Sequence, residues 1–160
     1  MTLKWHKTGY SKMLSGRSST DTEPEILLRH ALFSLGLRYR LNRLVTPRTK
    51  ADIVFPRARL AIFVDGCFWH GCPVHGRNQF RGPNACSWRT KMRRNKERDK
   101  RNTLEAEAQG WKVLRLWECE VRQSPTGLAR KVRTQVMKRI RKRPTVAATS
   151  TRRRRRGGSG

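Results

Sequence analysis

The sequence predicts a single α/β domain built around a mixed central β-sheet that is flanked by helices. A wholly apolar run over residues 60–64 is typical of a central strand that is buried on both faces. Helix-like and strand-like segments alternate along the chain, which favours helices packed on a sheet. The length of 160 residues leaves room for one compact core with additional segments.

Three helices are expected around this strand. The first begins at Thr22, where Glu25 follows at the spacing of a capping box with proline in the first turn, and Gly36 ends it. A long basic helix is expected over residues 86–109, and another basic helix over residues 126–141. The remaining strands are expected over residues 37–41, 51–55 and 111–117.

Charge is spread unevenly along the chain. There are 38 Lys and Arg against 11 Asp and Glu, a net charge of +27, and every acidic residue lies at or before Glu120. A positive charge of this size predicts a nucleic-acid backbone as the partner. We therefore expect a flexible basic arm over residues 1–20, a folded domain over residues 21–143 and a disordered polybasic tail over residues 144–160.

The sequence argues against a membrane partner and against secretion. No apolar run reaches the ~18 residues of a spanning helix, and no amphipathic apolar face accompanies the basic tail. The start has no apolar core of the signal-peptide type, which predicts a reducing cytoplasm. The four cysteines are then expected to be thiols or metal ligands rather than disulfides.

Three cysteines and a histidine form a candidate metal site. Cys67, Cys72 and His75 fall within nine residues after the apolar strand, and Cys119 lies at the end of the last strand. Three thiolates and an imidazole suit a closed tetrahedral zinc site, which would stabilise a loop without chemistry of its own. Alternatively, Cys67 and Cys119 are ordinary buried core residues, or the spare thiol Cys86 replaces His75 as a ligand.

Four acidic residues occupy positions that need a reason in so basic a chain. Asp52 lies inside a strand and Asp65 ends the most apolar one, and carboxylates at neighbouring strand ends can hold a divalent cation. Glu25 begins the apolar stripe of the first helix, and Asp99 continues an inward-facing stripe on the long helix. The alternatives are an arginine partner for Asp52 or Asp99, a turn role for Asp65 and a capping box for Glu25.

The segment between Gly66 and Gly82 is glycine-rich and predicts a loop, which carries Phe68, Trp69 and His70. His70 is either a zinc ligand or a free imidazole that takes a proton from attacking water near a phosphate. Phe68 and Trp69 either anchor their own loop or stack on and wedge between bases.

The run from Asp52 to His75, DIVFPRARLAIFVDGCFWHGCPVH, resembles the core of the very-short-patch mismatch-repair endonucleases of bacteria. The resemblance extends to residues 22–29, 95–99 and 110–119. It implies a restriction-endonuclease-like fold and magnesium-dependent, strand-specific nicking of duplex DNA at a G·T mismatch left by deamination of 5-methylcytosine.

The resemblance also implies a role for each candidate residue. Asp52 and the backbone carbonyl of Val64 would bind Mg2+, and His70 would be the general base. Glu25 and Asp99 would orient metal-bound waters. The structural Zn2+ would be held by Cys67, Cys72, His75 and Cys119.

For DNA, the resemblance implies that Phe68 and Trp69 enter the base stack from the major groove. The arm around Met13 and Leu14 would wedge from the minor groove. Leu14 departs from the usual methionine, although Met13 is adjacent. Asp65 stands where the family can have a catalytic-site histidine, which leaves direct metal ligation or a polar contact as its role.

The resemblance implies double-stranded DNA as the partner, and other mismatch-repair proteins are further candidates. The enzyme is expected to be a monomer in the bacterial cytoplasm, associated with the nucleoid. Two other functions stay open. One is a restriction or phage-defence nuclease of the same fold that does not require a mismatch. The other is a zinc-containing DNA-binding protein without catalysis, which Asp52 and His70 disfavour.

Overall fold

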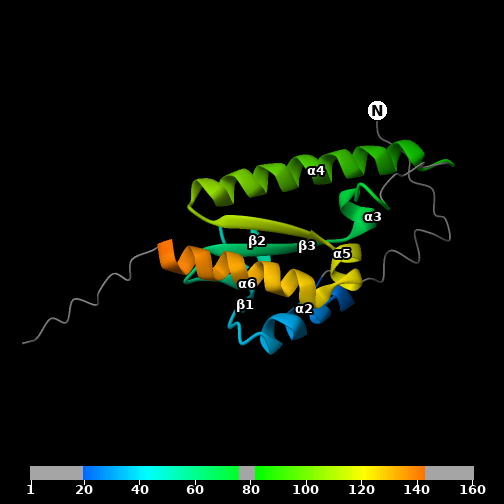
Figure 1. Ribbon diagram of the computed structural model, residues 1–160. Helices are drawn as coiled ribbons and strands as arrows, with labels where there is room; N and C mark the ends of the chain where they lie inside the picture. The colour runs from blue at the N-terminus through cyan, green and yellow to red at the C-terminus, as the bar shows by residue number, and fades with distance from the viewer. Residues whose placement is uncertain (1–19, 76–81, 143–160) are drawn as a thin grey trace, which may run out of the picture.

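The computed structural model describes residues 20–75 and 82–142 of the chain (Figure 1). Met13 and Leu14, with almost all of the expected arm, lie outside the described residues, as does the polybasic tail. The expected boundaries of the folded domain at residues 21 and 143 therefore stay predictions.

A four-stranded mixed sheet forms the centre of the domain, in the order β1-β2-β3-β4. The two hairpin pairs, β1 with β2 and β2 with β3, are antiparallel, whereas β3 and β4 are parallel. Because β3 and β4 run side by side in the same direction, the segments that follow them meet at one edge of the sheet. The strands are β1 Arg40–Leu44, β2 Lys50–Phe55, β3 Leu60–Asp65 and β4 Lys112–Trp117.

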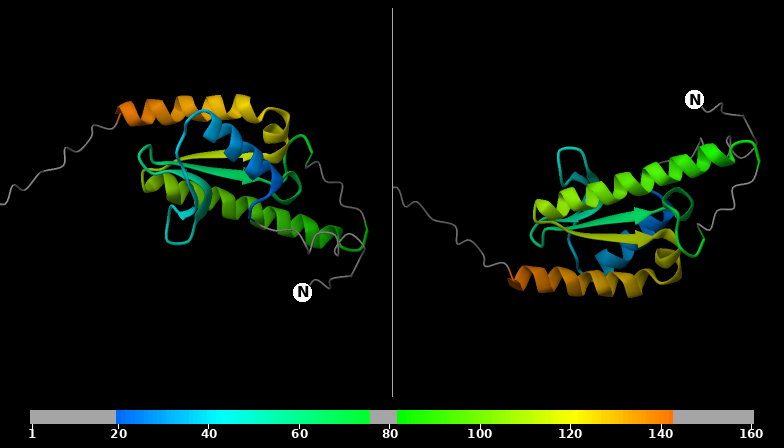
Figure 2. Two further views of the ribbon diagram at one scale, coloured as in Figure 1. Left: turned by 90° about the horizontal axis from the view of Figure 1, so that it is seen from below. Right: turned by 90° about the horizontal axis from the view of Figure 1, so that it is seen from above.

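Helices cover both faces of the sheet, which confirms the predicted α/β class. Helices α2 (Glu23–Ser34) and α6 (Pro125–Lys142) lie on one face, and the long α4 (Ala85–Ala108) lies on the other, as the views in Figure 2 agree. The short helices α3 (Cys67–His70) and α5 (Glu118–Gln123) follow β3 and β4. No helix in the described part of the chain is long and apolar enough to span a membrane.

The apolar run 60–64 contributes to hydrophobic cores on both faces of the sheet. Leu60 and Ile62 pack with α2 and α6 in the larger core, whereas Ala61 packs with α4 in the smaller one. All three side chains have no solvent-exposed area. The predicted central strand is therefore confirmed, and alternate side chains of β3 attach both helical layers to the sheet.

The strand expected over residues 37–41 begins three residues later, at Arg40. Helix α2 ends in a Schellman motif: Gly36 has φ +76°, its N–H donates to the Phe33 carbonyl, and the Leu37 N–H donates to the Leu32 carbonyl. Leu37 is buried at this helix end. Leu37 therefore belongs to the helix cap, although it continues the alternating apolar pattern that predicted a strand over residues 37–41.

Three further local expectations were wrong. Residues 67–70, which the sequence places in a loop, form the short helix α3. Thr22 does not cap α2 with its side chain; its hydroxyl donates instead to Oε1 of Glu25 at 2.8 Å. The segment after Trp117 is not simply a strand end but the start of α5, where the Trp117 N–H donates to Oε2 of Glu120 at 3.0 Å. Cys119 consequently lies in the first turn of a helix.

Candidate active site and metal cluster

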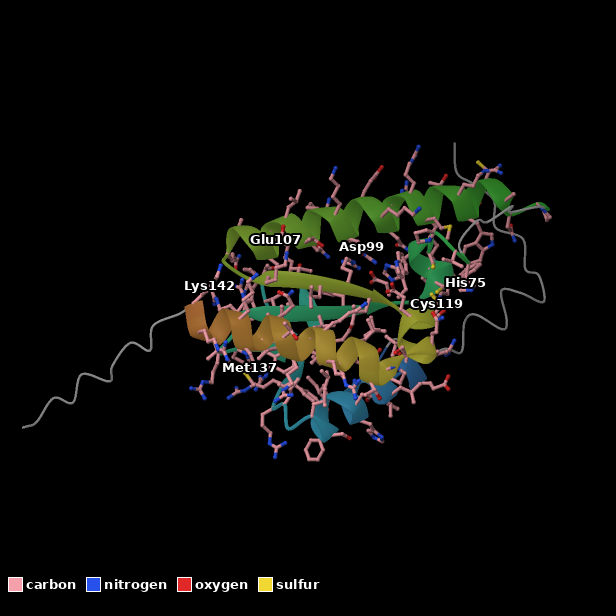
Figure 3. All side chains as sticks on the ribbon, viewed as in Figure 1. His75, Asp99, Glu107, Cys119, Met137 and Lys142 are labelled. Carbon is pink, nitrogen blue, oxygen red and sulfur yellow. The ribbon has the colours of Figure 1, made fainter. Side chains whose placement is uncertain are left out.

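The four expected zinc ligands come together where α3 and α5 leave the sheet. Gly71, with φ +67°, ends α3 and turns the chain so that the Cys72 N–H donates to the Cys67 carbonyl. The parallel pairing of β3 and β4 brings Cys119 to the same edge. Figure 3 shows His75 and Cys119 close to each other at this end of the molecule.

The donor atoms of Cys67, Cys72, His75 and Cys119 all lie within 4.8 Å of one another. The Sγ atom of Cys72 is 3.8 Å from Sγ of Cys119 and 3.9 Å from Nδ1 of His75. A tetrahedron with metal–sulfur bonds of about 2.3 Å has sulfur–sulfur edges of about 3.8 Å. The donor set therefore fits a tetrahedral metal ion. Cys86 is exposed on α4 and is not part of the cluster.

The thiols of this cluster differ in acidity. Burial raises the pKa of Cys67 to about 12. Burial also acts to raise the pKa of Cys72, but the backbone N–H groups of His75 and Val74 and the His75 side chain outweigh it and lower that pKa to about 6. The pKa of Cys72 is thus lower than that of Cys67, and a thiolate is the form that binds a metal.

A cleft of about 710 Å³ lies between the sheet and α4, next to the metal cluster. It brings together all five residues that the sequence analysis proposed for catalysis, and arginine and lysine side chains line it as well. The five residues are Glu25, Asp52, Asp65, His70 and Asp99.

Asp52 lies on β2, and its Oδ2 accepts a hydrogen bond of 2.7 Å from the Val64 N–H of β3. Burial, followed by the charges of Glu25 and Asp65, raises the pKa of Asp52 to about 6, although the hydrogen bond from Val64 and the charge of Arg115 oppose this rise. Within the described residues no arginine forms an ion pair with Asp52. A bound cation would offset the burial of this carboxylate.

Glu25 is buried in the first turn of α2 and lines the same cleft. Its Oε2 accepts a 2.9 Å hydrogen bond from Arg29, and Oε1 accepts from the Thr22 hydroxyl. These contacts fix the carboxylate without the capping box that the sequence suggested.

His70 and Asp99 form a close pair across the cleft. Nδ1 of His70 lies 2.5 Å from Oδ2 of Asp99, so this ring nitrogen carries the proton and donates it. Burial opposes ionisation of Asp99, but the hydrogen bond from His70 and the charge of Arg115 lower its pKa. In the neutral form of this ring the remaining nitrogen of His70, Nε2, is an acceptor. His70 is not among the clustered donor atoms of the metal site.

Both carboxylate oxygens of the buried Asp65 accept hydrogen bonds from Arg115, each at 2.6 Å. The same guanidinium lies 3.4 Å from Asp99 and over the ring of Phe63. Of the two roles considered for Asp65, this geometry matches the polar contact.

Phe68 and Trp69 form a half-buried aromatic cluster with Trp88 of α4. The ring centroids are 5.2 Å apart for Phe68 and Trp69 and 5.3 Å apart for Phe68 and Trp88. Lys91 lies over the rings of Trp69 and Trp88. Asn95 donates to the Trp69 carbonyl, so the inward stripe expected on the long helix faces α3.

Sequence reasoning missed Arg115, Trp88 and Lys91 as parts of the site. A detectable signal existed for Arg115, because a charged residue inside the strand Lys112–Trp117 is as unusual as Asp52 is in β2. The contribution of α4 had a weaker signal, since the positions of Trp88 and Lys91 become informative only once α3 is known to pack on α4.

Fold and site together define a basic α/β protein whose carboxylate-lined cleft adjoins a Cys/His cluster that could hold a metal ion. A family model described as DNA mismatch endonuclease Vsr matches residues 3–75. The chain is 44% identical over 116 residues to the type II nicking enzyme V.NaeI of Lentzea aerocolonigenes, covering 70% of this chain and 69% of that protein. It is 34% identical over 118 residues to the DNA mismatch endonuclease Vsr of Escherichia coli K12, covering 72% and 73%.

The type II nicking enzyme V.NmeDIP of Neisseria meningitidis serogroup C is 38% identical over 125 residues, which cover 78% of this chain and 84% of that protein. The chain belongs to the Vsr family of DNA mismatch endonucleases. It is therefore a DNA nicking endonuclease of that family, and the resemblance described above is confirmed.

Proposed function

We propose that this enzyme uses magnesium to nick one strand of duplex DNA at a G·T mismatch. The observation that carries the proposal is the cleft, in which Asp52, the Val64 main chain and the His70–Asp99 pair face one space. The mismatch is supported by the name of the Escherichia coli relative, and nicking by the names of the other relatives.

Asp52 and the Val64 carbonyl are the proposed ligands of magnesium. Both offer hard oxygen donors. Burial raises the pKa of Asp52, so a cation bound beside this carboxylate would favour its ionised form. The chemistry that magnesium supplies in such a site is polarisation of the phosphate and stabilisation of the leaving oxygen. Glu25 adds a second fixed carboxylate to the cleft and would orient water there.

His70 is the proposed general base. Its Nδ1–H bond to Asp99 selects the tautomer in which Nε2 is free to accept a proton from water. Asp99 orients the ring and stabilises the imidazolium that forms. Asp65 and Arg115 sit beside this pair, and we propose a positioning role for Asp65 through its contact with Arg115.

Zinc is the proposed occupant of the Cys/His cluster, because three thiolates and an imidazole are soft donors in tetrahedral spacing. The four residues leave no open position, so the site is structural. It would hold α3 against α5, and α3 carries the aromatic pair and His70.

DNA recognition would combine backbone contacts with distortion of a weakly paired site. Phe68 and Trp69, extended by Trp88, form the proposed wedge from the major groove, since half-buried rings next to the cleft can stack on bases. Met13 and Leu14 remain the proposed minor-groove wedge. A mismatch favours this mode of binding because it costs less to unstack than a matched pair.

A second candidate function is nicking that does not require a mismatch. The relatives called type II nicking enzymes are named for nicking alone and not for a mismatch. End-labelled duplexes that differ only by one G·T or G·C pair separate the two functions. The proposal expects cleavage of one strand of the G·T duplex with magnesium and none with calcium. Equal nicking of both duplexes would support the second candidate instead.

A further inference from the structure

Helix α6 presents a basic face on the outside of the domain. The helix has seven Lys and Arg and no acidic residue. Its apolar side chains Leu128, Val132 and Val136 are buried in the larger core, and Arg139 turns inward to donate to the main-chain oxygens of Ala58 and Gly110. The six other basic side chains are exposed: Arg130, Lys131, Arg133, Lys138, Arg141 and Lys142.

The charge of this face is not balanced within the described structure. Across residues 20–75 and 82–142, no ion pair involves a Lys or Arg side chain of α6. Bases three or four residues apart, such as Arg130 with Arg133 and Lys138 with Arg141, repel one another along the helix. A polyanion bound along the face would relieve this repulsion.

The basic face of α6 points away from the active-site cleft. The cleft is lined by residues of the sheet and the β1–β2 connection, of α3 and α4, and of the starts of α2 and α5, but by none of α6. Figure 2 shows α6 and α4 on opposite sides of the sheet, and in Figure 3 Met137 of α6 lies across the sheet from Asp99 of α4. A duplex in the cleft would have to bend around the domain to reach the outer face of α6, and bending duplex DNA over so short a length is energetically costly.

We propose that the outer face of α6 binds the phosphate backbone of a second segment of duplex DNA while the cleft holds the first. The proposal rests on duplex DNA being the substrate. Between Arg133, Lys138 and Arg141 the surface has a hollow of about 510 Å³, in which a phosphate group can approach several basic side chains together. Such a second contact would carry no base specificity and would let the enzyme transfer between DNA segments.

The chemistry of the face favours DNA over an anionic membrane. A helix that lies in a lipid interface buries an apolar face in the lipid. In α6 the apolar face is already packed on the domain, and the exposed apolar side chains are Met137 and Ile140, which are 42% and 36% exposed. Two exposed apolar side chains among six basic ones are too few to insert into a lipid interface, so the DNA phosphate backbone is the partner that fits this face.

The test compares two variants of the full chain that lose the same charge. R133Q/K138Q/R141Q changes the proposed face, and R40Q/R43Q/R57Q removes three exposed bases at β1 and the β2–β3 turn. Two matched duplexes with donor and acceptor fluorophores are mixed with each protein without magnesium, so that energy transfer reports one enzyme holding both. Circular dichroism verifies that each variant is folded.

The wild type and the β1 variant are expected to form the two-duplex complex, whereas the α6 variant binds the second duplex at least tenfold more weakly. The slope of log K against log salt for the second duplex should fall by about 3 in the α6 variant, since each lost phosphate contact contributes about 1. Equal losses in both variants, or retained transfer in the α6 variant, would overturn the proposal. So would an α6-dependent affinity for phosphatidylserine vesicles that exceeds the affinity for DNA. Lys131→Gln together with Arg130→Gln provides a second test if the first α6 variant does not fold.

Discussion

Arg115 donates one hydrogen bond to each carboxylate oxygen of Asp65, both at 2.6 Å, across the parallel pair β3 and β4. This bidentate arrangement directs Nε and one terminal nitrogen of the guanidinium at the Asp65 carboxylate, while the same guanidinium lies 3.4 Å from Asp99. Because Asp65 is buried and Arg115 is only partly exposed, either charge left alone would lack full solvation. Removing only one member of the Asp65–Arg115 pair should therefore destabilise the folded state.

Arg115→Gln should lower the free energy of unfolding by about 2–4 kcal/mol, because it leaves the buried Asp65 carboxylate without its partner. The double variant D65N/R115Q should recover most of that loss, since neither charge remains. Urea denaturation of the wild type, both single variants and the double variant gives the coupling energy. Additive losses would show that the pair is not a unit.

Asp52→Asn should stabilise the metal-free protein at pH 7.5 by about 1–2 kcal/mol. The folded pKa of Asp52, about 6, lies above the ordinary aspartate value of 3.8, so the folded state keeps a proton that the unfolded state releases between these values. Stability contributed by this group therefore falls as pH rises from about 4 to 6 and stays low above it. The full shift corresponds to about 3 kcal/mol, which partial exposure reduces.

Denaturation curves at pH 4 and pH 7.5 without magnesium test this sign. The variant should be the more stable protein at pH 7.5 and equal to the wild type at pH 4. Glu97→Gln, at an exposed position on α4, is the matched control and should show no such difference. Asp52→Asn should also abolish nicking at any pH. A variant that is less stable than the wild type at pH 7.5 would contradict the proposed burial penalty.

Protein purified without chelator should contain one zinc atom per chain. Cys119→Ser should lose the metal and lower the melting temperature, because a hydroxyl is a poor replacement for a thiolate in a soft-donor site. Cys86→Ser is the matched control, since Cys86 is exposed and outside the cluster. Elemental analysis and thermal denaturation measure both effects. A Cys119→Ser protein that keeps its zinc and its stability would exclude Cys119 as a ligand.

The elements with strong local patterns could be predicted from the sequence. The apolar run of β3 and the long basic helix agree closely with β3 and α4. The boundaries of β1 could not be predicted, because Leu37 is an apolar residue of a helix cap that continues the alternation of a strand. Helix α5 was missed because only six residues form it and their pattern is too short to show a period.

The site was partly predictable because its residue types are unusual where they stand. Cysteines near strand ends and acidic residues in apolar strands were visible in the sequence, and the parallel pairing of β3 and β4 brings them together. Contacts that depend on how α4 crosses the sheet were not visible. Asp99 could be placed on an inward face, but its bond to His70 follows only from the packing of α3 on α4.

Trp69→Ala should weaken binding to a G·T duplex by about 1–3 kcal/mol while the protein stays folded, if the ring stacks on a base. Phe33→Ala is the matched control, because Phe33 is 61% exposed on α2, away from the cleft. Fluorescence anisotropy measures binding, and circular dichroism follows folding. Since Trp69 packs on Phe68 and Trp88, loss of the folded state would instead identify it as an anchor of α3.

Substitutions of His70 and Asp99 should act on the same step of catalysis. His70→Ala should lower the nicking rate by about 10²–10⁴-fold and leave a residual rate that rises with pH, because hydroxide partly replaces the base. Asp99→Asn should also be slow, since its amide can donate to Nδ1 and so favours the tautomer that has no acceptor at Nε2. Zinc lost from His70→Ala would identify His70 as a metal ligand instead.

The double variant H70A/D99N distinguishes the two roles considered for Asp99. If Asp99 acts through His70, as their 2.5 Å contact indicates, removing both should be no slower than His70→Ala alone, because the second change has nothing left to orient. If Asp99 instead orients water independently, the two losses should multiply. Single-turnover nicking of a G·T duplex across pH 6–9 measures all three variants, with Glu97→Gln as the control on the exposed side of α4. Multiplicative losses would therefore assign Asp99 to the water and leave His70 to act without it.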